Sequence, residues 1–171
     1  MSKRDLKKYL YILTKEQLEE QIIDLYDKFI DIKVYYNFVF NPKEDKLFQE
    51  AKLKISNEYF PVRGKKPKLR RSTAQKIIKH FSTLGVDPFI ISDIMLYSIE
   101  IAQTYSAEKH IKQDSFYKSM LNSFEQAIQY MIEKNSLDTF KNRVGAIANK
   151  TTELNWINQY EFNAIIERFE Y

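Results

Sequence analysis

The sequence has no cysteine, only three glycines and two histidines among its 171 residues. The lack of cysteine excludes disulfides, thiolate zinc sites, iron–sulfur clusters and thiol nucleophiles. Three isolated glycines exclude the glycine-rich loops that cradle phosphates in P-loop and dinucleotide-binding proteins. Since there are also only four prolines, the chain is short of the residues that make the many tight turns of an all-β fold.

Long apolar segments are missing as well. The longest uncharged run covers the nine residues 34–42, whereas a membrane-spanning helix needs about 20 apolar residues. The first residues are basic and contain neither an apolar stretch nor a small-residue cleavage pattern. We therefore expect a cytoplasmic protein that does not contact a membrane.

Helical periodicity is present almost throughout and is interrupted by capping residues. Ser2 with Asp5 and Thr14 with Gln17 have the spacing of capping boxes. Gly85 suits the position just after a helix, and Asp87 followed by proline suits the start of the next one. An apolar stripe with spacings of four, three, four and three marks one helix face: Leu18, Ile22, Leu25, Phe29 and Ile32.

These signals predict an all-α protein of seven or eight helices. The predicted helices cover residues 2–13, 14–40, 42–59, 72–84, 88–105, 114–134, 136–149 and 155–171, with a possible break near Asp31 and with Asn41 as the cap of the third. Short linkers favour antiparallel neighbours. We expect residues 1–171 to form a single-domain antiparallel helical bundle or a short irregular α–α superhelix, with residues 61–71 as a basic loop.

The segment 88–105 is apolar almost all round, which is typical of a helix buried by neighbours on several sides. We expect it at the centre of the fold, with Ile94 and Ile101 both in the core.

Several local strings together resemble a known family. They are the opening MSKRDLKKYL, the turn NPKEDKL from Asn41, Arg70-Arg71-Ser72 before a helix, LGVDP from Leu84 and EIAQTYS from Glu100. Along essentially its whole length the chain resembles a family of small bacterial proteins, mostly from Bacteroidota, that is classed as a domain of unknown function. The resemblance implies a single helical domain and carries no functional residue.

Positive charge is concentrated in one segment. Residues 61–86 hold eight basic side chains and no acidic one, whereas the remainder holds 19 basic and 23 acidic side chains. Basic side chains that are clustered before a helix start are typical of a phosphate-binding surface. The sequence thus predicts a polyanion site, for nucleic acid or a phosphate-bearing ligand, made by Arg63, Lys65, Lys66, Lys68, Arg70, Arg71, Ser72, Lys76 and Lys79.

Two features bear on this hypothesis. Tyr59 and Phe60 precede the basic segment and could stack on bases. There are three alternatives: the loop is solvated, it contacts an acidic partner protein, or it docks on the chain's own acidic stripe. This stripe consists of Glu16, Glu20, Asp24, Asp27 and Asp31.

The acidic stripe over residues 16–31 also permits an enzymatic hypothesis, a Mg²⁺-dependent nucleotide hydrolase. Such a site needs facing pairs of carboxylates. The best second pair is Asp93 and Glu100, two helical turns apart. His80 and His110 lack partners at catalytic or metal-binding spacing and are expected on the surface. We therefore predict no catalytic residue, metal site or cofactor.

Aromatic residues form two clusters in the sequence, and clustered aromatic side chains occur both in cores and at protein–protein interfaces. Core packing is the favoured interpretation, and a protein–protein adaptor is the alternative. The two clusters are Tyr35, Tyr36, Phe38 and Phe40, and Trp156, Tyr160 and Phe162.

Overall fold

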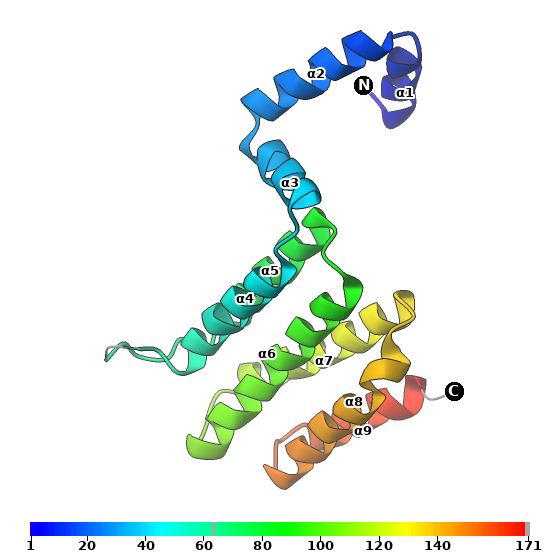
Figure 1. Ribbon diagram of the computed structural model, residues 1–171. Coiled ribbons are helices and arrows are strands. Elements are labelled where there is room, and N and C mark those ends of the chain that lie inside the picture. The colour runs from blue at the N-terminus through cyan, green and yellow to red at the C-terminus, as the bar shows by residue number, and fades with distance from the viewer. Residues whose placement is uncertain (63, 170–171) are drawn as a thin grey trace. The chain divides into compact units, whose positions relative to one another are not determined.

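The computed structural model describes residues 1–62 and 64–169, and these residues form nine helices and no strand (Figure 1). The predicted all-α class is confirmed, with one helix more than the upper prediction. The chain divides into two compact units, residues 1–43 and residues 44–171, each of which is described by itself.

The first unit contains α1 (Lys3–Tyr11), α2 (Lys15–Lys28) and α3 (Ile30–Phe40). Both predicted capping boxes are present, at Ser2 with Asp5 and at Thr14 with Gln17. The additional helix arises because the chain becomes extended at Phe29, with φ −119° and ψ 114°. The break considered near Asp31 therefore exists and falls at Phe29, where no side chain caps α3.

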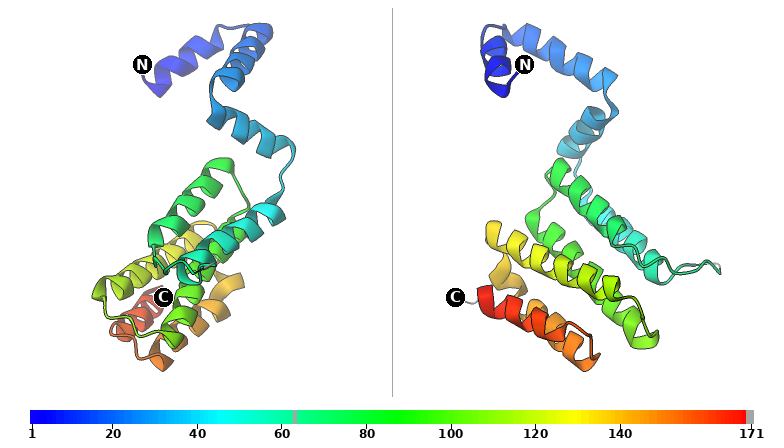
Figure 2. Two further views of the ribbon diagram at one scale, coloured as in Figure 1. Left: turned by 90° about the vertical axis from the view of Figure 1, so that its left-hand side faces the viewer. Right: turned by 180° about the vertical axis from the view of Figure 1, so that it is seen from behind.

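The second unit consists of three antiparallel helical hairpins that lie side by side (Figures 1 and 2). The middle hairpin packs against both of the others, and α6 itself contacts helices of each. The hairpins are α4 (Glu44–Tyr59) with α5 (Arg71–Leu84), α6 (Pro88–Glu108) with α7 (Asp114–Glu133), and α8 (Leu137–Glu153) with α9 (Gln159–Phe169).

Helix α6 is the centre of this unit, as the sequence predicts. Ile94, Leu96, Ile99 and Ala102 are completely buried. Ile101, expected in the core, is only half-buried. A step of seven residues falls about 20° short of two full turns, which moves Ile101 away from the centre of the face that Ile94 occupies.

A second part of the core is aromatic. The Trp156 ring meets Phe116, Tyr117 and Phe162 edge-on, with centroids 5.5–5.8 Å apart. Its indole Nε1 donates a hydrogen bond to Ser106 Oγ at 3.0 Å. Trp156 and Phe162 are therefore core residues, whereas Tyr160 is 77% exposed.

The helix ends in the second unit agree only in part with the predictions. Gly85 adopts a left-handed φ of 78° after α5, and the Asp87 side chain accepts from Phe89 N at the start of α6. The predicted cap at Asn41 is not formed, since α4 begins only at Glu44 and Asn41 instead ends α3. Glu44 Oε1 accepts a hydrogen bond from Asp87 N at 2.9 Å. Similarly, α9 begins at Gln159 rather than at Asn155, which itself has a positive φ of 49°.

Across residues 1–62 and 64–169, none of the helices combines the length and the apolar character that crossing a membrane requires.

The central position of α6 generates a prediction. Ile94→Ala should lower the free energy of unfolding by about 2–5 kcal/mol, because a completely buried side chain leaves a cavity. Urea denaturation measures the loss. The control is Leu53→Ala on α4, where the leucine is 62% exposed and the expected change is within about 0.5 kcal/mol. Equal effects of the two substitutions would contradict the central placement of α6.

Candidate anion-binding site

Glu58 anchors the loop that joins α4 to α5. Its backbone oxygen accepts hydrogen bonds from Lys68 N at 2.9 Å and Leu69 N at 3.1 Å. Its carboxylate accepts a two-point hydrogen bond from Arg70, at 2.9 Å from Nε and 2.8 Å from Nη2. A further bond comes from Thr73 Oγ1 at 3.0 Å. The second half of the loop is thereby tied to the last turn of α4.

The anchored segment carries backbone strain. Leu69 has a φ of 52°, a left-handed conformation that costs about 1–2 kcal/mol for a residue with a side chain. The hydrogen bonds from Lys68 N and Leu69 N to Glu58 hold the chain in this conformation. The loop is therefore fixed in shape at its second half.

Charge pairing shifts the ionisation of both partners. The Arg70 hydrogen bonds lower the pKa of the Glu58 carboxyl, against the opposing effect of burial. The same bonds raise the pKa of Arg70. Glu58 is only 9% exposed, so its carboxylate is the buried member of the pair.

Arg71 forms hydrogen bonds with α7, whereas Arg70 forms them with α4. Its Nε donates to Ser123 Oγ at 2.7 Å and its Nη2 donates to Gln126 Oε1 at 2.6 Å, so it joins α5 to α7. Partial burial lowers its pKa. Arg70 and Arg71 thus find hydrogen-bond partners within the second unit, namely Glu58 for Arg70 and Ser123 with Gln126 for Arg71.

The predicted site residues thus fall into groups. Arg63 lies outside the described residues. Ser72 is the second residue of α5 and not its cap, because α5 begins at Arg71 and Arg70 occupies the capping position. Lys76 and Lys79 are exposed on α5, and Lys76 lines a hollow of about 190 Å³ with Lys54 and His80.

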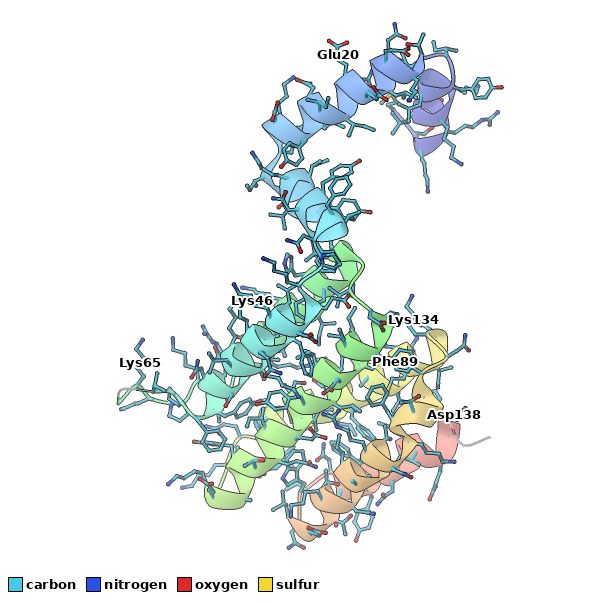
Figure 3. All side chains as sticks on the ribbon, in the orientation of Figure 1. Glu20, Lys46, Lys65, Phe89, Lys134 and Asp138 are labelled. Atoms are coloured by element: carbon cyan, nitrogen blue, oxygen red, sulfur yellow. The ribbon has the colours of Figure 1, made fainter. Side chains whose placement is uncertain are left out.

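The loop lysines form the most concentrated group. Lys65, Lys66 and Lys68 are exposed and line a pocket of about 200 Å³ whose wall also includes Arg70. The loop projects beyond the ends of α4 and α5, as the position of Lys65 shows (Figure 3). Among the described residues, no carboxylate forms an ion pair with these three lysines. We refer to Lys65, Lys66 and Lys68 as the lysine loop.

The two aromatic residues expected to stack on bases, Tyr59 and Phe60, pack against the Tyr105 ring. Tyr59 is 3% exposed and packs on Tyr105, with ring centroids 6.0 Å apart. Burial raises the pKa of its hydroxyl. Phe60 is half-buried against the same Tyr105 ring at 5.7 Å. The prediction that Tyr59 could stack on bases is wrong.

The second carboxylate pair considered for a metal binds an arginine instead. Arg143 on α8 donates from Nη1 to Asp93 Oδ1 at 2.9 Å, and from Nε and Nη2 to Glu100 at 2.5 and 2.7 Å. These bonds raise the pKa of Arg143. Lys52 adds a longer contact of 3.6 Å to Asp93. The guanidinium lies where a cation between these carboxylates would have to bind.

The other candidate residues are arranged as follows. On α2, Asp24 pairs with Lys28 at 2.7 Å, and Glu19 pairs with Lys15 at 3.6 Å. In the part of the chain that the structure describes, no three histidine or acidic side chains gather as metal ligands. His80 and His110 are exposed.

Glu58 is the functional residue that the sequence analysis missed. A signal for it exists, because Glu58 is the only acidic residue between Glu50 and Asp87. A single carboxylate beside a run of basic side chains is the natural partner for one of them.

The anchor generates a prediction for pH. Glu58→Gln should lower the free energy of unfolding by roughly 1–3 kcal/mol at pH 7, because charge-assisted hydrogen bonds are lost. The pKa of Glu58 is lower in the folded chain than its ordinary value of 4.5. The stabilisation by the Glu58 charge is therefore complete above the ordinary pKa of 4.5 and is lost as the pH falls through the lower pKa of the folded chain.

Urea denaturation at several pH values between 7 and 3 tests this. The gap between wild type and Glu58→Gln should narrow at acid pH. Glu50→Gln is the control, since that carboxylate is exposed and makes only a 3.9 Å contact with Lys46. A gap of constant size would contradict the role of the Glu58 charge.

The Arg143 bridge generates a further prediction. Arg143→Ala should cost about 1.5–3 kcal/mol of stability, since hydrogen bonds to two partly buried carboxylates disappear. Arg143→Lys should recover only part of it, because one ammonium group cannot present the same planar fork. Arg168→Ala is the control in urea denaturation, as its exposed pair with Glu125 is worth about 0–1 kcal/mol. A loss no larger than that of the control would contradict the bridge.

Comparison with protein-family models matches residues 1–170 to a family described as "Family of unknown function (DUF6155)". The match covers all but the last residue, so the predicted whole-chain resemblance to a family of unknown function is confirmed. No curated protein and no solved structure matches the chain. The chain belongs to the family DUF6155, whose function is unknown.

Proposed function

We propose that the protein is a non-enzymatic binding module that contacts a polyanion, such as a nucleic acid strand, through the lysine loop. The single observation that carries the proposal is that Arg70 is paired with a carboxylate whereas the lysines of the loop are exposed. Among the described residues that line the pocket at this loop, Glu58 is the one carboxylate, and it is hydrogen-bonded to Arg70. The lysines of the loop stay exposed around the same pocket.

The charge distribution of the second unit supports this assignment. Residues 44–86, which contain α4, the loop and α5, hold eleven basic and four acidic side chains. Residues 87–171 hold eight basic and twelve acidic ones. The hairpin therefore presents a positive surface, and an extended anion gains most from contact at its projecting end.

The anchor at Glu58 contributes to binding indirectly. Exposed lysines on a mobile loop lose conformational entropy when they bind, whereas a loop fixed in shape has already lost part of it. Arg70 and Arg71 thus act as positioning residues, since they hold the loop against α4 and α7. Lys65, Lys66 and Lys68 are the residues that would touch phosphates.

Anisotropy of a short labelled RNA or DNA strand, measured over a salt series, tests the proposal. Each contacted phosphate on a single strand contributes a slope of about 0.7 to the fall of log affinity with log salt. Three or four contacts give a slope of about −2 to −3. Replacing Lys65, Lys66 and Lys68 together by alanine should flatten this slope and leave the urea midpoint nearly unchanged, because all three are exposed.

A charge-matched control replaces the exposed Lys112, Lys134 and Lys150 by alanine. It removes the same net charge away from the loop and should leave most of the affinity. Absence of binding by the wild type at low salt would overturn the proposal. So would an equal loss in both triple variants, which would indicate attraction to overall charge alone.

The adaptor alternative is favoured by a different observation. On α3, Phe40 is 82% exposed and Tyr35 is 42% exposed. The Tyr36 ring lies near both, with its centroid 5.5 Å from that of Tyr35 and 6.2 Å from that of Phe40. Exposed aromatic side chains of this kind supply the main contacts of many protein interfaces.

A further inference from the structure

The first unit leaves its apolar side chains uncovered. None of the residues in α1, α2 or α3 is buried. The described residues hold twenty exposed large hydrophobic side chains, and fourteen of them fall within residues 1–43: Met1, Leu6, Tyr9, Tyr11, Ile12, Ile22, Ile23, Leu25, Phe29, Ile30, Val34, Tyr35, Val39 and Phe40. Such a concentration in one quarter of the chain, with no residue of its three helices buried, indicates a surface that takes part in an interface.

The same unit contains helices that are at best marginally stable by themselves. Helix α1 has nine residues and α2 has fourteen, and isolated helices shorter than about 12–15 residues are marginal in water. Both begin with complete capping boxes, so their ends are well defined in the sequence. The stabilisation that capping cannot supply must come from packing of the apolar faces.

Charge is separated between these two helices. Helix α1 carries Lys3, Arg4, Lys7 and Lys8 against the single acid Asp5, which is engaged in the capping box. Helix α2 carries five acids against two lysines at its ends: Glu16, Glu19, Glu20, Asp24 and Asp27. One helix is therefore basic and the next is acidic.

A groove lies between α1 and α2. It measures about 500 Å³, and its lining combines apolar side chains, among them Leu13 and Ile23, with the acids Glu20, Asp24 and Asp27. Figure 3 shows Glu20 projecting away from α2. An amphipathic helix with apolar and basic side chains fits such a lining, and α1 has that composition.

We propose that residues 1–43 form a two-fold homodimer interface in which α1 of each copy packs on α2 of the other. In a two-fold interface, each contact occurs twice with the roles exchanged. A surface of one sign would repel its own copy, whereas a basic helix next to an acidic one complements itself. A standard interface takes about 20–30 residues from each partner, which residues 1–43 can supply.

Light scattering coupled to size exclusion, over a range of protein concentrations, tests the dimer first. The wild-type chain should have twice the monomer mass of 20.5 kDa at high concentration. The variant Lys3→Glu with Lys7→Glu makes α1 acidic, and Glu20→Lys with Asp27→Lys makes α2 basic. Each should dissociate at concentrations at least about tenfold higher than the wild type, because like charges then face each other.

Mixing the two variants gives the decisive result. The acidic α1 of one variant then meets the basic α2 of the other, and the basic α1 meets the acidic α2. The mixture should regain the dimer mass, although neither variant alone does so at the same concentration. A matched control, Lys112→Glu/Lys134→Glu, makes the same charge change at exposed positions outside residues 1–43 and should dimerise like the wild type.

Helicity measured by circular dichroism confirms that the variants fold. A wild type that stays monomeric throughout would overturn the proposal, as would variants that dimerise like the wild type. A mixture that stays monomeric would overturn the pairing of α1 with α2. The lysine loop is unchanged in all these variants, so nucleic acid binding can be measured separately.

Discussion

The burial of α6 is the constraint on which the second unit depends. A helix that is apolar over most of its surface has to be covered by neighbours, and α4, α5, α7 and α8 provide the cover. Some of the polar groups in this interior form hydrogen bonds across helices. Gln103 Nε2 donates to Ile147 O at 2.7 Å, and the hydroxyls of Ser92 and Ser136 lie 3.3 Å apart. Because α4 is held against this core, its last turn has a fixed position, and so does Glu58.

Glu58 converts a run of like charges into a defined surface. Eight basic residues without an acid among them repel one another, and repulsion of that kind normally extends a loop. Here the Glu58 carboxylate neutralises Arg70. The Glu58 backbone oxygen accepts hydrogen bonds from Lys68 N and Leu69 N and so holds the loop against α4. The strain at Leu69 is offset by these bonds. Repulsion among the remaining lysines persists, and an anion from outside would relieve it.

The sequence predicts those features of the fold that depend on neighbours along the chain. The capping boxes at Ser2 and Thr14, the left-handed Gly85 and the apolar α6 all follow from residues within a few positions. The errors arise where distant residues compete. The Glu44 carboxylate accepts a hydrogen bond from the distant Asp87 N instead of completing a cap at the start of α4. Arg71 donates hydrogen bonds to Ser123 and Gln126 on α7. For the site, the basic segment is predictable from composition, but its division into anchoring arginines and exposed lysines is not.

Amphipathicity shows that a helix face needs cover and does not show what covers it. The stripe from Leu18 to Ile32 has the same periodicity as buried helices of the second unit, yet α2 buries no side chain. The two proposals meet at this point. A dimer formed through residues 1–43 carries two lysine loops in one particle, and a strand long enough to reach both binds the second as an intramolecular event. The dimer would then contact more phosphates than the monomer, and its affinity would fall more steeply with salt. Pairing of the N-terminal helices would in this way convert a weak single contact into a strong double one without any change in the loop itself.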